Sequence, residues 1–312
     1  MFQFMRYVYE VYKEMSFSRA ARNLFISQPS LSTAVKKEEE RIGHPIFDRS
    51  TNPIKLTEIG QAYIRSVEKI LETENSFKNY VNDLENLKNG TLFIGGTNFF
   101  VSYVLPPLLS RFSGRYPMVK TQLIEASTEE LKEKLNAGIL DLLLDNSTLD
   151  EEIYGRTTIQ EEHLLLAVPK EFSSNSKAAA YALTAGDVKE GRHLETEMKA
   201  VPIRLFQDEP FLLLREGNDT RERAVHICKA ACFIPEIRLE LDQQITAYNL
   251  ACHGMGISFV GDSLIRNVPD TDSLLFYKLD NQDSVRQISF YYRKNRYCPK
   301  AMEVFLEMID CG

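Results

Sequence analysis

Polar side chains gather at the start of one short predicted helix near the N-terminus. Ser27 is its expected N-cap, and Pro29 falls in its first turn, where a missing backbone N–H costs nothing. Gln28 can form two hydrogen bonds with an adenine edge, and the hydroxyl groups of Ser30 and Thr33 suit base edges or phosphates. Four cationic side chains could neutralise phosphates close by: Arg22, Lys36, Lys37 and Arg49. This chemistry indicates a nucleic-acid contact, against the alternative of a small helical domain whose charges are merely solvated.

Three short helices are predicted to position these side chains. Spacings of three and four define one apolar face of the first helix, formed by Met5, Val8, Val11 and Met15. Ser16 or Ser18 can cap a second helix over Arg19 to Phe25, and the third helix runs from Ser27 to a stop at Gly43. This order is the helix-turn-helix plan, which places the N-terminus of the third helix in the DNA major groove. Residues 44–56 look like a β-loop or wing.

Charge is distributed unevenly along the chain of 312 residues. The net charge is −7, which by itself argues against a nucleic-acid partner, yet residues 1–56 carry nine Lys or Arg against six Asp or Glu. A basic head on an acidic body indicates two tasks in one chain. No apolar run reaches the ~18 residues that a membrane span needs, no signal-peptide pattern opens the sequence, and the five cysteines are an odd number. We therefore expect a cytoplasmic protein with no membrane partner and no disulfide scaffold.

A long helix without proline is predicted over residues 57–87. Thr57 can cap it, and Asn89-Gly90 is a suitable stop. Apolar residues recur along it at alternating spacings of four and three, interrupted at Glu74, and form a narrow seam suited to pairing with another helix: Tyr63, Val67, Ile70, Phe77, Val81 and Leu84. We expect a linker that also forms a dimer interface, so that two recognition helices meet a two-fold symmetric DNA site. The alternative is a core helix of one domain.

From Thr91 onward the pattern changes to alternating strands and helices. The predicted strands are Leu92–Gly95, Val119–Glu125, Ile139–Leu144, Leu164–Val168, Phe211–Leu214, Arg238–Leu241, Ile257–Val260 and Ile288–Tyr292. The helices predicted between them include Tyr103–Arg115, Glu129–Asn136, Arg221–Phe233 and Gln243–His253. This alternation indicates an α/β domain with a mostly parallel sheet, large enough for two lobes.

A run of residues through the first 60 positions keeps the types and spacing of a known family. The run is Ser16-Phe17-Ser18-Arg19-Ala20-Ala21, Leu24, Ser27-Gln28-Pro29-Ser30-Leu31-Ser32, Glu39, Ile42-Gly43, Pro45-Ile46-Phe47, Arg49, Leu56-Thr57 and Gly60. It resembles the head of LysR-type transcriptional regulators. Two positions depart from the family pattern, where Met15 replaces a glycine and Glu38 replaces a leucine on the apolar side of the third helix. Because an unpaired buried carboxylate is costly, Glu38 must reach solvent or a partner.

The rest of the chain is similar to the same family more loosely. The matching segments are Leu105-Pro106 to Phe112, Tyr116-Pro117, Leu131 to Leu135, Gly138, Asp141-Leu142 and Gly254-Met255-Gly256-Ile257. The resemblance implies an N-terminal winged helix-turn-helix domain (1–58), a linker and dimerisation helix (59–88) and an effector-binding domain (89–312). The effector domain would be a two-lobed, periplasmic-binding-protein-like α/β fold. Its first lobe would span about 91–163 and 267–312, and its second about 164–266.

The resemblance also implies where the two sites lie. At the DNA it places Gln28, Pro29, Ser30, Thr33, Lys36, Arg49, Thr51 and Asn52, to which the predicted site adds Arg22, Ser27, Ser32 and Lys37. A small effector between the lobes would meet loops that follow strands: Thr97, Asn98, Phe99, Ser127, Thr128, Asp145 and Asn146 in the first lobe, and Phe206, Gln207, Asn218, Gln243 and Gln244 in the second. Hydroxyl and amide groups at helix N-termini suit a carboxylate or other anion. The alternatives are that Ser127 only starts a capping box with Glu130, and that Asp145 repels an anion or caps a helix.

Other chemistry-bearing residues favour ordinary roles. Cys228 and Cys232 lie four apart on a predicted helix near His226, which leaves a cysteine-based redox sensor of the same family as an alternative, although such cysteines are typical of a helix core. The histidines with no obvious partner are His163, His193 and His253. The motifs of serine hydrolases, phosphate-binding loops and zinc proteases are missing, so we expect no catalytic residues, no metal and no cofactor.

These observations together predict a transcription regulator without enzymatic activity. It would bind double-stranded promoter DNA as a homodimer or homotetramer. A small molecule between the two lobes would control it by favouring one lobe arrangement or assembly over another. The alternative from another class is a small-molecule-binding or enzymatic α/β protein whose helical head is only structural.

Overall fold

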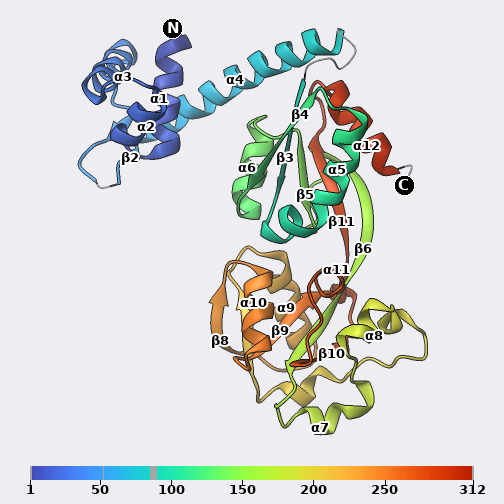
Figure 1. Cartoon of the computed structure of the whole chain (residues 1–312). Helices are drawn as coiled ribbons and strands as arrows, with labels where there is room; N and C mark the ends of the chain where they lie inside the picture. Colours follow the sequence, from blue (N-terminus) through green and yellow to red (C-terminus); the bar gives the residue numbers. More distant parts are fainter. Residues whose placement is uncertain (1, 52, 85–89, 311–312) are drawn as a thin grey trace. The chain divides into compact units, whose positions relative to one another are not determined.

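The chain forms two compact units in the computed structural model, which describes residues 2–51, 53–84 and 90–310. The N-terminal unit extends to Val81, and the C-terminal unit holds most of the remainder. Figure 1 labels the elements of both units. Each unit has its own hydrophobic core, which allows each to be described by itself.

The N-terminal unit is a three-helix head followed by a small β-ribbon and a long helix. Its elements are α1 (Phe2–Glu14), α2 (Phe17–Asn23), α3 (Gln28–Ile42), β1 (Phe47–Asp48), β2 (Lys55–Leu56) and α4 (Glu58–Leu84). The two short strands pair antiparallel, as expected for a wing. One core joins the helices, the ribbon and the start of α4, and includes Val8, Leu31, Ile46 and Ile64.

Local caps set the ends of the short helices. The Ser16 hydroxyl accepts a hydrogen bond from the Arg19 amide at 3.4 Å, so α2 begins two residues earlier than expected. The Ser27 hydroxyl accepts the Ser30 amide at 3.2 Å and begins α3. Gly43 ends α3 with a φ of 84°, a left-handed conformation that favours glycine. The predicted bounds of α3 are therefore confirmed.

The C-terminal unit is built on one mixed sheet with strand order β4-β3-β5-β11-β6-β9-β7-β8, and β10 pairs with β6 outside this path. Its strands are β3 (Gly90–Gly96), β4 (Val119–Glu125), β5 (Leu142–Asp145), β6 (Tyr154–Pro169), β7 (Pro210–Leu214), β8 (Glu236–Leu241), β9 (Ile257–Gly261), β10 (Leu274–Lys278) and β11 (Val285–Arg293). The prediction of a mostly parallel sheet is wrong, because β11 pairs antiparallel with β5 and β6, and β6 pairs antiparallel with β9 and β10.

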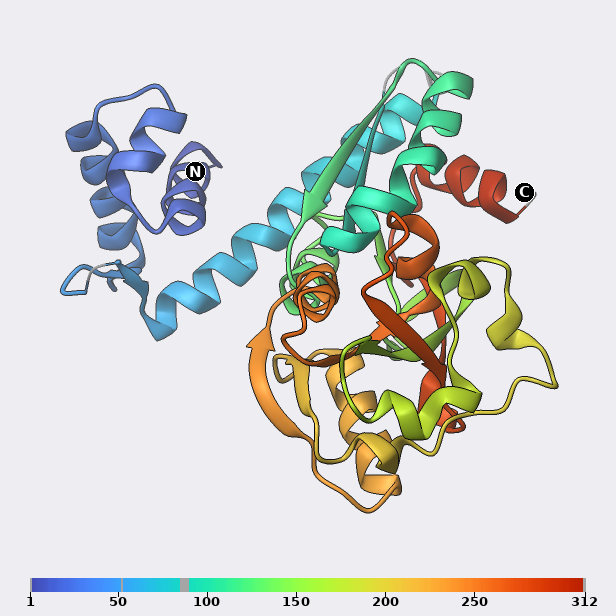
Figure 2. The same ribbon diagram turned by 60° about the horizontal axis from the view of Figure 1, so that its bottom comes forward.

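Strand β6 runs through both groups of strands, which form the two lobes drawn in Figure 1 and Figure 2. Its residues 154–163 pair with β11, whereas residues 164–169 pair with β9 and β10. Strand β10 therefore lies with the second lobe, and the expected assignment of all of 267–312 to the first lobe is wrong. The error arises because the strand prediction omits β10 and because the polar first half of β6 lacks the pattern of a strand.

Helices cover both faces of the sheet. The longer ones are α5 (Leu105–Arg115), α6 (Thr128–Asn136), α9 (Asp219–Ala230), α10 (Gln244–Cys252) and α12 (Lys300–Asp310). The shorter ones are η1 (Phe100–Val104), α7 (Asn175–Ala178), η2 (Ala179–Tyr181), α8 (Ala185–Lys189), η3 (Arg192–Leu194), η4 (Ile203–Phe206), α11 (Asp262–Asn267) and η5 (Gln282–Ser284). No helix in the described ranges is both long and apolar enough to cross a membrane.

Alternation along the strands separates two apolar layers in the first lobe. On β11, Phe290 packs with Phe112 of α5 and Phe305 of α12, whereas its neighbour Tyr291 packs with Leu131 of α6. Successive side chains of a strand point to opposite faces, so α5 and α12 cover one face and α6 the other. Because helices pack on both faces, the strands are held in place, and so are the polar loops that follow them.

Candidate nucleic-acid and ligand sites

The N-terminus of α3 is exposed, as a reading surface for DNA must be. Three of its hydroxyl groups are engaged locally: Ser27 and Ser30 lie 2.7 Å apart, and Thr33 donates to the Pro29 carbonyl at 2.9 Å. Gln28 is exposed, and its side chain has no hydrogen bond to the described part of the chain. Among the predicted base contacts, Gln28 therefore has its amide available for a partner.

The cations of the head differ in how they are held. Lys37 and Arg22 are exposed, and Lys36 lies 3.9 Å from Glu40, the upper end of an ion-pair distance. Arg49 is fixed more firmly, because it donates to Glu39 at 2.8 Å and its guanidinium lies 5.0 Å from the centre of the Phe17 ring. Of the other wing residues, Thr51 is half-buried with its hydroxyl unpaired, and Asn52 lies outside the described residues.

Glu39 fastens the wing to the third helix. One carboxylate oxygen of this α3 residue accepts the backbone N–H groups of Ile46 at 2.9 Å and Phe47 at 3.2 Å, and the other accepts Arg49. The run of residues that carries the family resemblance includes Glu39 but assigns it no role. Its role here is to hold α3 and β1 in one arrangement.

Glu38 is buried inside the head with two partners. Its side chain is 1% exposed, and it accepts hydrogen bonds from Arg41 at 2.7 and 2.9 Å and from the Tyr63 hydroxyl at 2.7 Å. The Arg41 guanidinium holds the pKa of Glu38 below its ordinary value, against the opposing effect of burial and with help from Tyr63. The requirement that Glu38 reach a partner is thus met, and the partner on α4 joins that helix to α3.

The expected ligand residues of the first lobe do gather at one edge of the sheet. Parallel strands β3, β4 and β5 end there, and their following loops are linked by side chains. Asn98 donates to Glu125 at 3.0 Å, and Thr128 donates to Asp145 at 3.0 Å. Asn146 donates to the buried Glu162 of β6 at 3.2 Å.

Three other expectations for the first lobe are answered by local structure. Ser127 and Glu130 form the predicted capping box, in which each side chain accepts the other residue's amide, at 3.3 and 3.2 Å. Phe99 is buried in the core beside Phe100. Asp145 is buried and also accepts the Ser147 amide at 2.7 Å, so its carboxylate serves the turn after β5.

In the second lobe residues 206–207 do not follow a strand, unlike the other expected ligand residues. Phe206 is fully buried in the core of the lobe, and Gln207 accepts a hydrogen bond from Arg204. Both residues precede β7, so they lie at the amino end of the strand and not in a loop after a strand. Asn218 follows β7 as expected, but its side chain caps α9 by accepting the Thr220 amide at 2.9 Å.

The start of α10 lies after a strand, as expected for a loop that contacts the effector. Gln243 and Gln244 follow β8, and the first turn of α10 carries no acidic residue. The Gln244 side-chain nitrogen Nε2 is buried and has no hydrogen-bond partner in the described structure. A donor buried in this way is costly unless a ligand or water accepts from it.

A buried ionic network that the sequence did not predict lies where β6 and β11 pair. Arg286 of β11 donates to Glu162 of β6 at 2.6 Å and to Asp219 of α9 at 2.8 Å. Its side chain is 1% exposed and that of Glu162 is 0% exposed. Ser263 of α11 also donates to Glu162. The network joins strands β6 and β11 to helices α9 and α11. The signal in the sequence is the charged residue that each of these two strands carries at a buried position.

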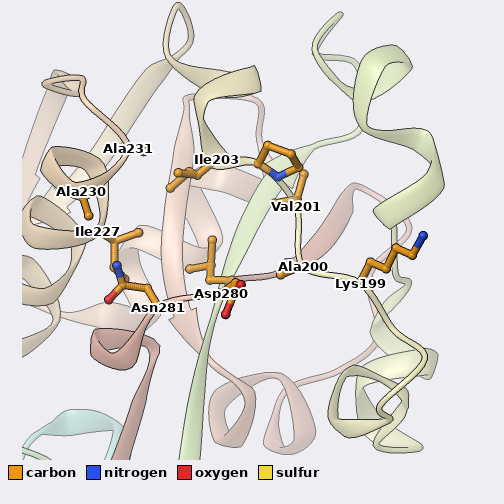
Figure 3. A pocket seen from close by; sticks show the side chains of 11 residues that line it. Lys199, Ala200, Val201, Ile203, Ile227, Ala230, Ala231, Asp280 and Asn281 are labelled. Carbon is orange, nitrogen blue, oxygen red and sulfur yellow. The ribbon is translucent and has the colours of Figure 1, made fainter.

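Two described pockets lie elsewhere in the C-terminal unit. The larger, of about 540 Å³, is drawn in Figure 3 and is lined by residues 199–203, by Ile227, Ala230 and Ala231 of the α9 segment, and by residues 279–281. The smaller, of about 320 Å³, is lined by residues that include His163 and His193. Neither contains a predicted effector residue.

Comparisons with known proteins match both units. The family model described as a bacterial regulatory helix-turn-helix protein of the lysR family matches residues 2–61, and the LysR substrate binding domain matches residues 85–311. A relative described as an uncharacterized HTH-type transcriptional regulator, YcgK of Bacillus subtilis, is 30% identical over 304 residues, which cover 97% of this chain and 92% of the relative. The chain belongs to the LysR family.

Further relatives support the same assignment. A probable RuBisCO transcriptional regulator of Gracilaria tenuistipitata is 27% identical over 98% of this chain and 94% of its own length. The structure of a full-length OxyR variant from Pseudomonas aeruginosa has a TM-score of 0.68 at 23% identity, covering 99% of this chain and 94% of that one. CbnR in complex with its target DNA has a TM-score of 0.66 at 20% identity, covering 100% and 99%. The predicted fold class is confirmed, and the chain is a DNA-binding transcription regulator of the LysR type.

The predicted dimer seam of this LysR-type chain is only partly available to a second copy, because its first residues pack within the N-terminal unit. Tyr63 bonds Glu38 and Val67 is buried within the N-terminal unit, so both serve the chain's own core. Ile70 is half-buried, and Phe77 is 67% exposed. The side chains of Val81 and Leu84 lie outside the described residues. The seam remains a prediction for the later turns of α4.

The cysteine alternative finds no support in the helix that carries it. Cys228 is fully buried, and burial raises the pKa of its thiol to about 12, which keeps it protonated and unreactive near neutral pH. Cys232 is exposed and follows the helix at a positive φ of 60°. A buried, protonated Cys228 is a core residue of the regulator.

Replacing Glu38 by glutamine tests the buried contact between α3 and α4. We expect Glu38→Gln to lower the free energy of unfolding by about 1–2 kcal/mol at pH 7, because it weakens hydrogen bonds to Arg41 and Tyr63. The folded-state pKa of Glu38 is lowered, so this stabilisation is present above the unfolded pKa and is lost as the pH falls through the folded one. Denaturant unfolding followed by circular dichroism measures the loss. Glu40→Gln, an exposed control, should change little, and equal losses for both variants would contradict the assignment.

Proposed function

We propose that this regulator binds a two-fold symmetric promoter site as a homodimer or homotetramer and that a small anionic effector changes this binding. The proposal keeps the predicted division into residues 1–58, 59–88 and 89–312. The observation that carries it is the exposed N-terminus of α3, where Gln28 is available and Arg49 is held in the wing by Glu39. It assigns the chain no catalytic role and places its action in the cytoplasm.

Oligomer formation is proposed for the part of α4 beyond the head. Phe77 is a large apolar side chain left mainly exposed at a predicted seam position of this helix, where a partner helix would cover it. Pairing two copies through α4 would present two α3 helices to one duplex. The relative CbnR, which shares the fold, has been crystallised with its target DNA.

The effector is proposed to bind at the start of α10 and at the loop after β3. The first turns of α6 and α9 carry acidic residues, Glu129 and Glu130 in one and Asp219 and Glu222 in the other, which disfavour an anion there. The start of α10 has no such residue, and Gln244 offers an unpaired buried donor. A carboxylate oxygen would satisfy that donor.

DNA recognition is tested by selecting sequences that the full-length chain retains from a random duplex library. We expect enrichment of an inverted repeat whose half-sites lie about one helical turn or a multiple of it apart. Affinity for the selected site should fall linearly with the logarithm of salt concentration and exceed that for random DNA by about 10³-fold or more. Failure to enrich any sequence at low salt would contradict the proposed function.

Effector binding is tested by a thermal-shift screen of small carboxylates with the full-length chain. A true effector raises the melting temperature, because it binds only the folded state. We expect Gln244→Ala to weaken that stabilisation by about tenfold in apparent affinity, the loss of one hydrogen bond to a charged group. Asn249→Ala, an exposed change on the same helix, is the matched control. A hit that both variants bind as well as wild type would exclude Gln244 from the site.

A further inference from the structure

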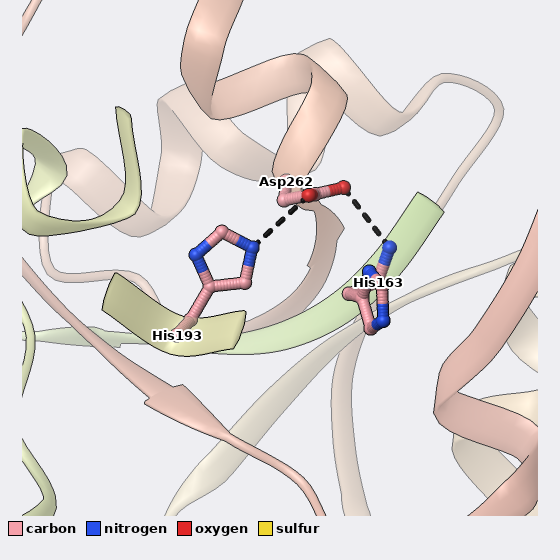
Figure 4. Close-up of side chains that lie close together, drawn as sticks. All are labelled: His163, His193 and Asp262. Carbon is pink, nitrogen blue, oxygen red and sulfur yellow. Dashed lines mark hydrogen bonds and ion pairs between the residues drawn. The ribbon is translucent and has the colours of Figure 1, made fainter. Parts of the chain in front are cut away.

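Three metal-ligating side chains from distant parts of the sequence meet in the second lobe. They are His163 of β6, His193 of η3 and Asp262 at the start of α11, and one ligand atom of each lies within 4.8 Å of the others. Figure 4 shows the carboxylate of Asp262 between the two histidines. The sequence expectation that His163 and His193 have no partner is therefore wrong. The sequence separation hides the cluster, since the nearest pair is thirty positions apart in the printed sequence.

The carboxylate is held in place by three donors. His193 Nε2 lies 3.0 Å from Oδ2 of Asp262, and the backbone N–H of His163 donates to Oδ1 at 2.9 Å. Arg266, one turn further along α11, contacts Oδ2 at 2.9 Å with a partly exposed side chain. The side chains of His193 and Asp262 are almost fully buried, at 1% and 3% exposure. Such fixed geometry is what a preorganised ligand set requires.

Each imidazole retains a buried nitrogen with no partner. His163 Nδ1 and His193 Nδ1 are both enclosed and make no hydrogen bond within the described structure. On His193 this nitrogen is turned away from Asp262 (Figure 4), so the atom of His193 that would bind an ion beside Asp262 is Nε2. Buried polar atoms of this kind are rare, because each carries a desolvation cost that nothing repays. On His163 the opposite nitrogen, Nε2, lies 3.4 Å from a carboxylate oxygen of Glu161. A carboxylate at the far nitrogen is the usual support of a metal-bound histidine.

An entry route is also present. The pocket of about 320 Å³ described above is lined by both histidines, together with Lys278, Asp280 and Gln282 among others. The two rings lie with centres 6.0 Å apart and planes at 73°. A small ion in this pocket would have direct access to them.

We propose that His163, His193 and Asp262 bind one divalent transition-metal ion such as Zn²⁺. Two imidazoles and one carboxylate are a ligand set that zinc and its neighbours in the first transition row accept, with water in the remaining position. Small side-chain rotations would bring the three ligand atoms, now within 4.8 Å, to a common ion. His163 lies on β6, the strand that both lobes share, where it pairs with Val285 of β11. A bound ion would therefore link α11 and η3 to β6.

The test uses the full-length chain without a histidine tag, freed of metal by a chelator. Titration with Co²⁺, followed by visible absorption and by calorimetry, should show one ion per chain and a d–d band. The spectrum should lack the near-ultraviolet thiolate-to-metal charge-transfer band that a cysteine site would give. Zn²⁺ should displace Co²⁺ and raise the melting temperature.

Variants decide whether these side chains are the ligands. His163→Gln and His193→Gln should each weaken Co²⁺ binding by at least the roughly 10–100-fold that loss of a supporting partner costs. His253→Gln, an exposed histidine of the same lobe, is the matched control and should bind as wild type. Circular dichroism of the metal-free variants reports folding, and His163→Gln carries the test if the more buried His193→Gln does not fold. No Co²⁺ binding by wild type, thiolate absorption, or unchanged binding in His163→Gln would each overturn the proposal. Because DNA selection uses no metal, its outcome is independent of this one.

Discussion

Replacing Arg286 with methionine is expected to lower the free energy of unfolding by about 3–5 kcal/mol, the largest loss for any single substitution considered. Arg286 is the buried cation between Glu162 and Asp219. Methionine has a similar volume but no charge, so the change leaves the carboxylate of Glu162 fully buried without its cation. Denaturant unfolding of the full chain, followed by circular dichroism, measures the effect.

Two further variants separate charge from packing at this site. Arg215→Met removes a surface pair with Asp242, at 3.1 Å with both side chains mainly exposed, and should cost no more than about 1 kcal/mol. The double variant Arg286→Met with Glu162→Leu should recover much of the loss, because it removes the uncompensated carboxylate as well. A double variant no more stable than Arg286→Met alone would show that the stranded charge is not the cause.

Replacing Gln28 with alanine is expected to cost about 1–3 kcal/mol in binding to the selected DNA site and to relax the preference for one base in each half-site. The reason is that the Gln28 amide is exposed at the N-terminus of α3 and makes no hydrogen bond within the described head. Fluorescence anisotropy against the selected site and single-base variants of it measures both effects. Gln160→Ala, an exposed change in the C-terminal unit, is the control and should leave binding unaltered.

Lys36→Ala provides the contrasting result. Lys36 is exposed and only loosely paired with Glu40, so we assign it to phosphate. Its loss should weaken binding to all sequences alike and reduce the slope of log affinity against log salt by about 1. If Gln28→Ala and Lys36→Ala gave the same pattern of sequence preference and salt dependence, the division into base and phosphate contacts would be wrong.

Features set by neighbouring residues could be predicted from the sequence. The bounds of α3 follow from Ser27, Pro29 and Gly43, all within the helix or beside it, and the capping box of α6 follows from residues three apart. Strand β4 has its predicted bounds for the same reason, since its alternation and the flanking turns are local. The fold class itself follows from the resemblance of the head and body to the LysR family.

Features that depend on distant partners could not be predicted. The first half of β6 is rich in polar residues and is a strand because β11 pairs with it. A partner strand more than a hundred residues away leaves no mark on the local pattern. The same separation hides Arg286, whose carboxylate partner Glu162 lies 124 residues earlier. The burial of Phe206 could not be predicted either, because its ring packs against that of Tyr277, which lies 71 residues later.

The carboxylate of Glu39 has a consequence for the choice of promoter. It accepts hydrogen bonds from the amides at the start of β1 and from Arg49, so α3 and β1 are held together as one piece. At a DNA site where the distance between the major and minor grooves does not match the distance between α3 and β1, the DNA must deform, because α3 and β1 are held together. Flexible pyrimidine–purine steps between the two contacts would then be favoured although no side chain touches them.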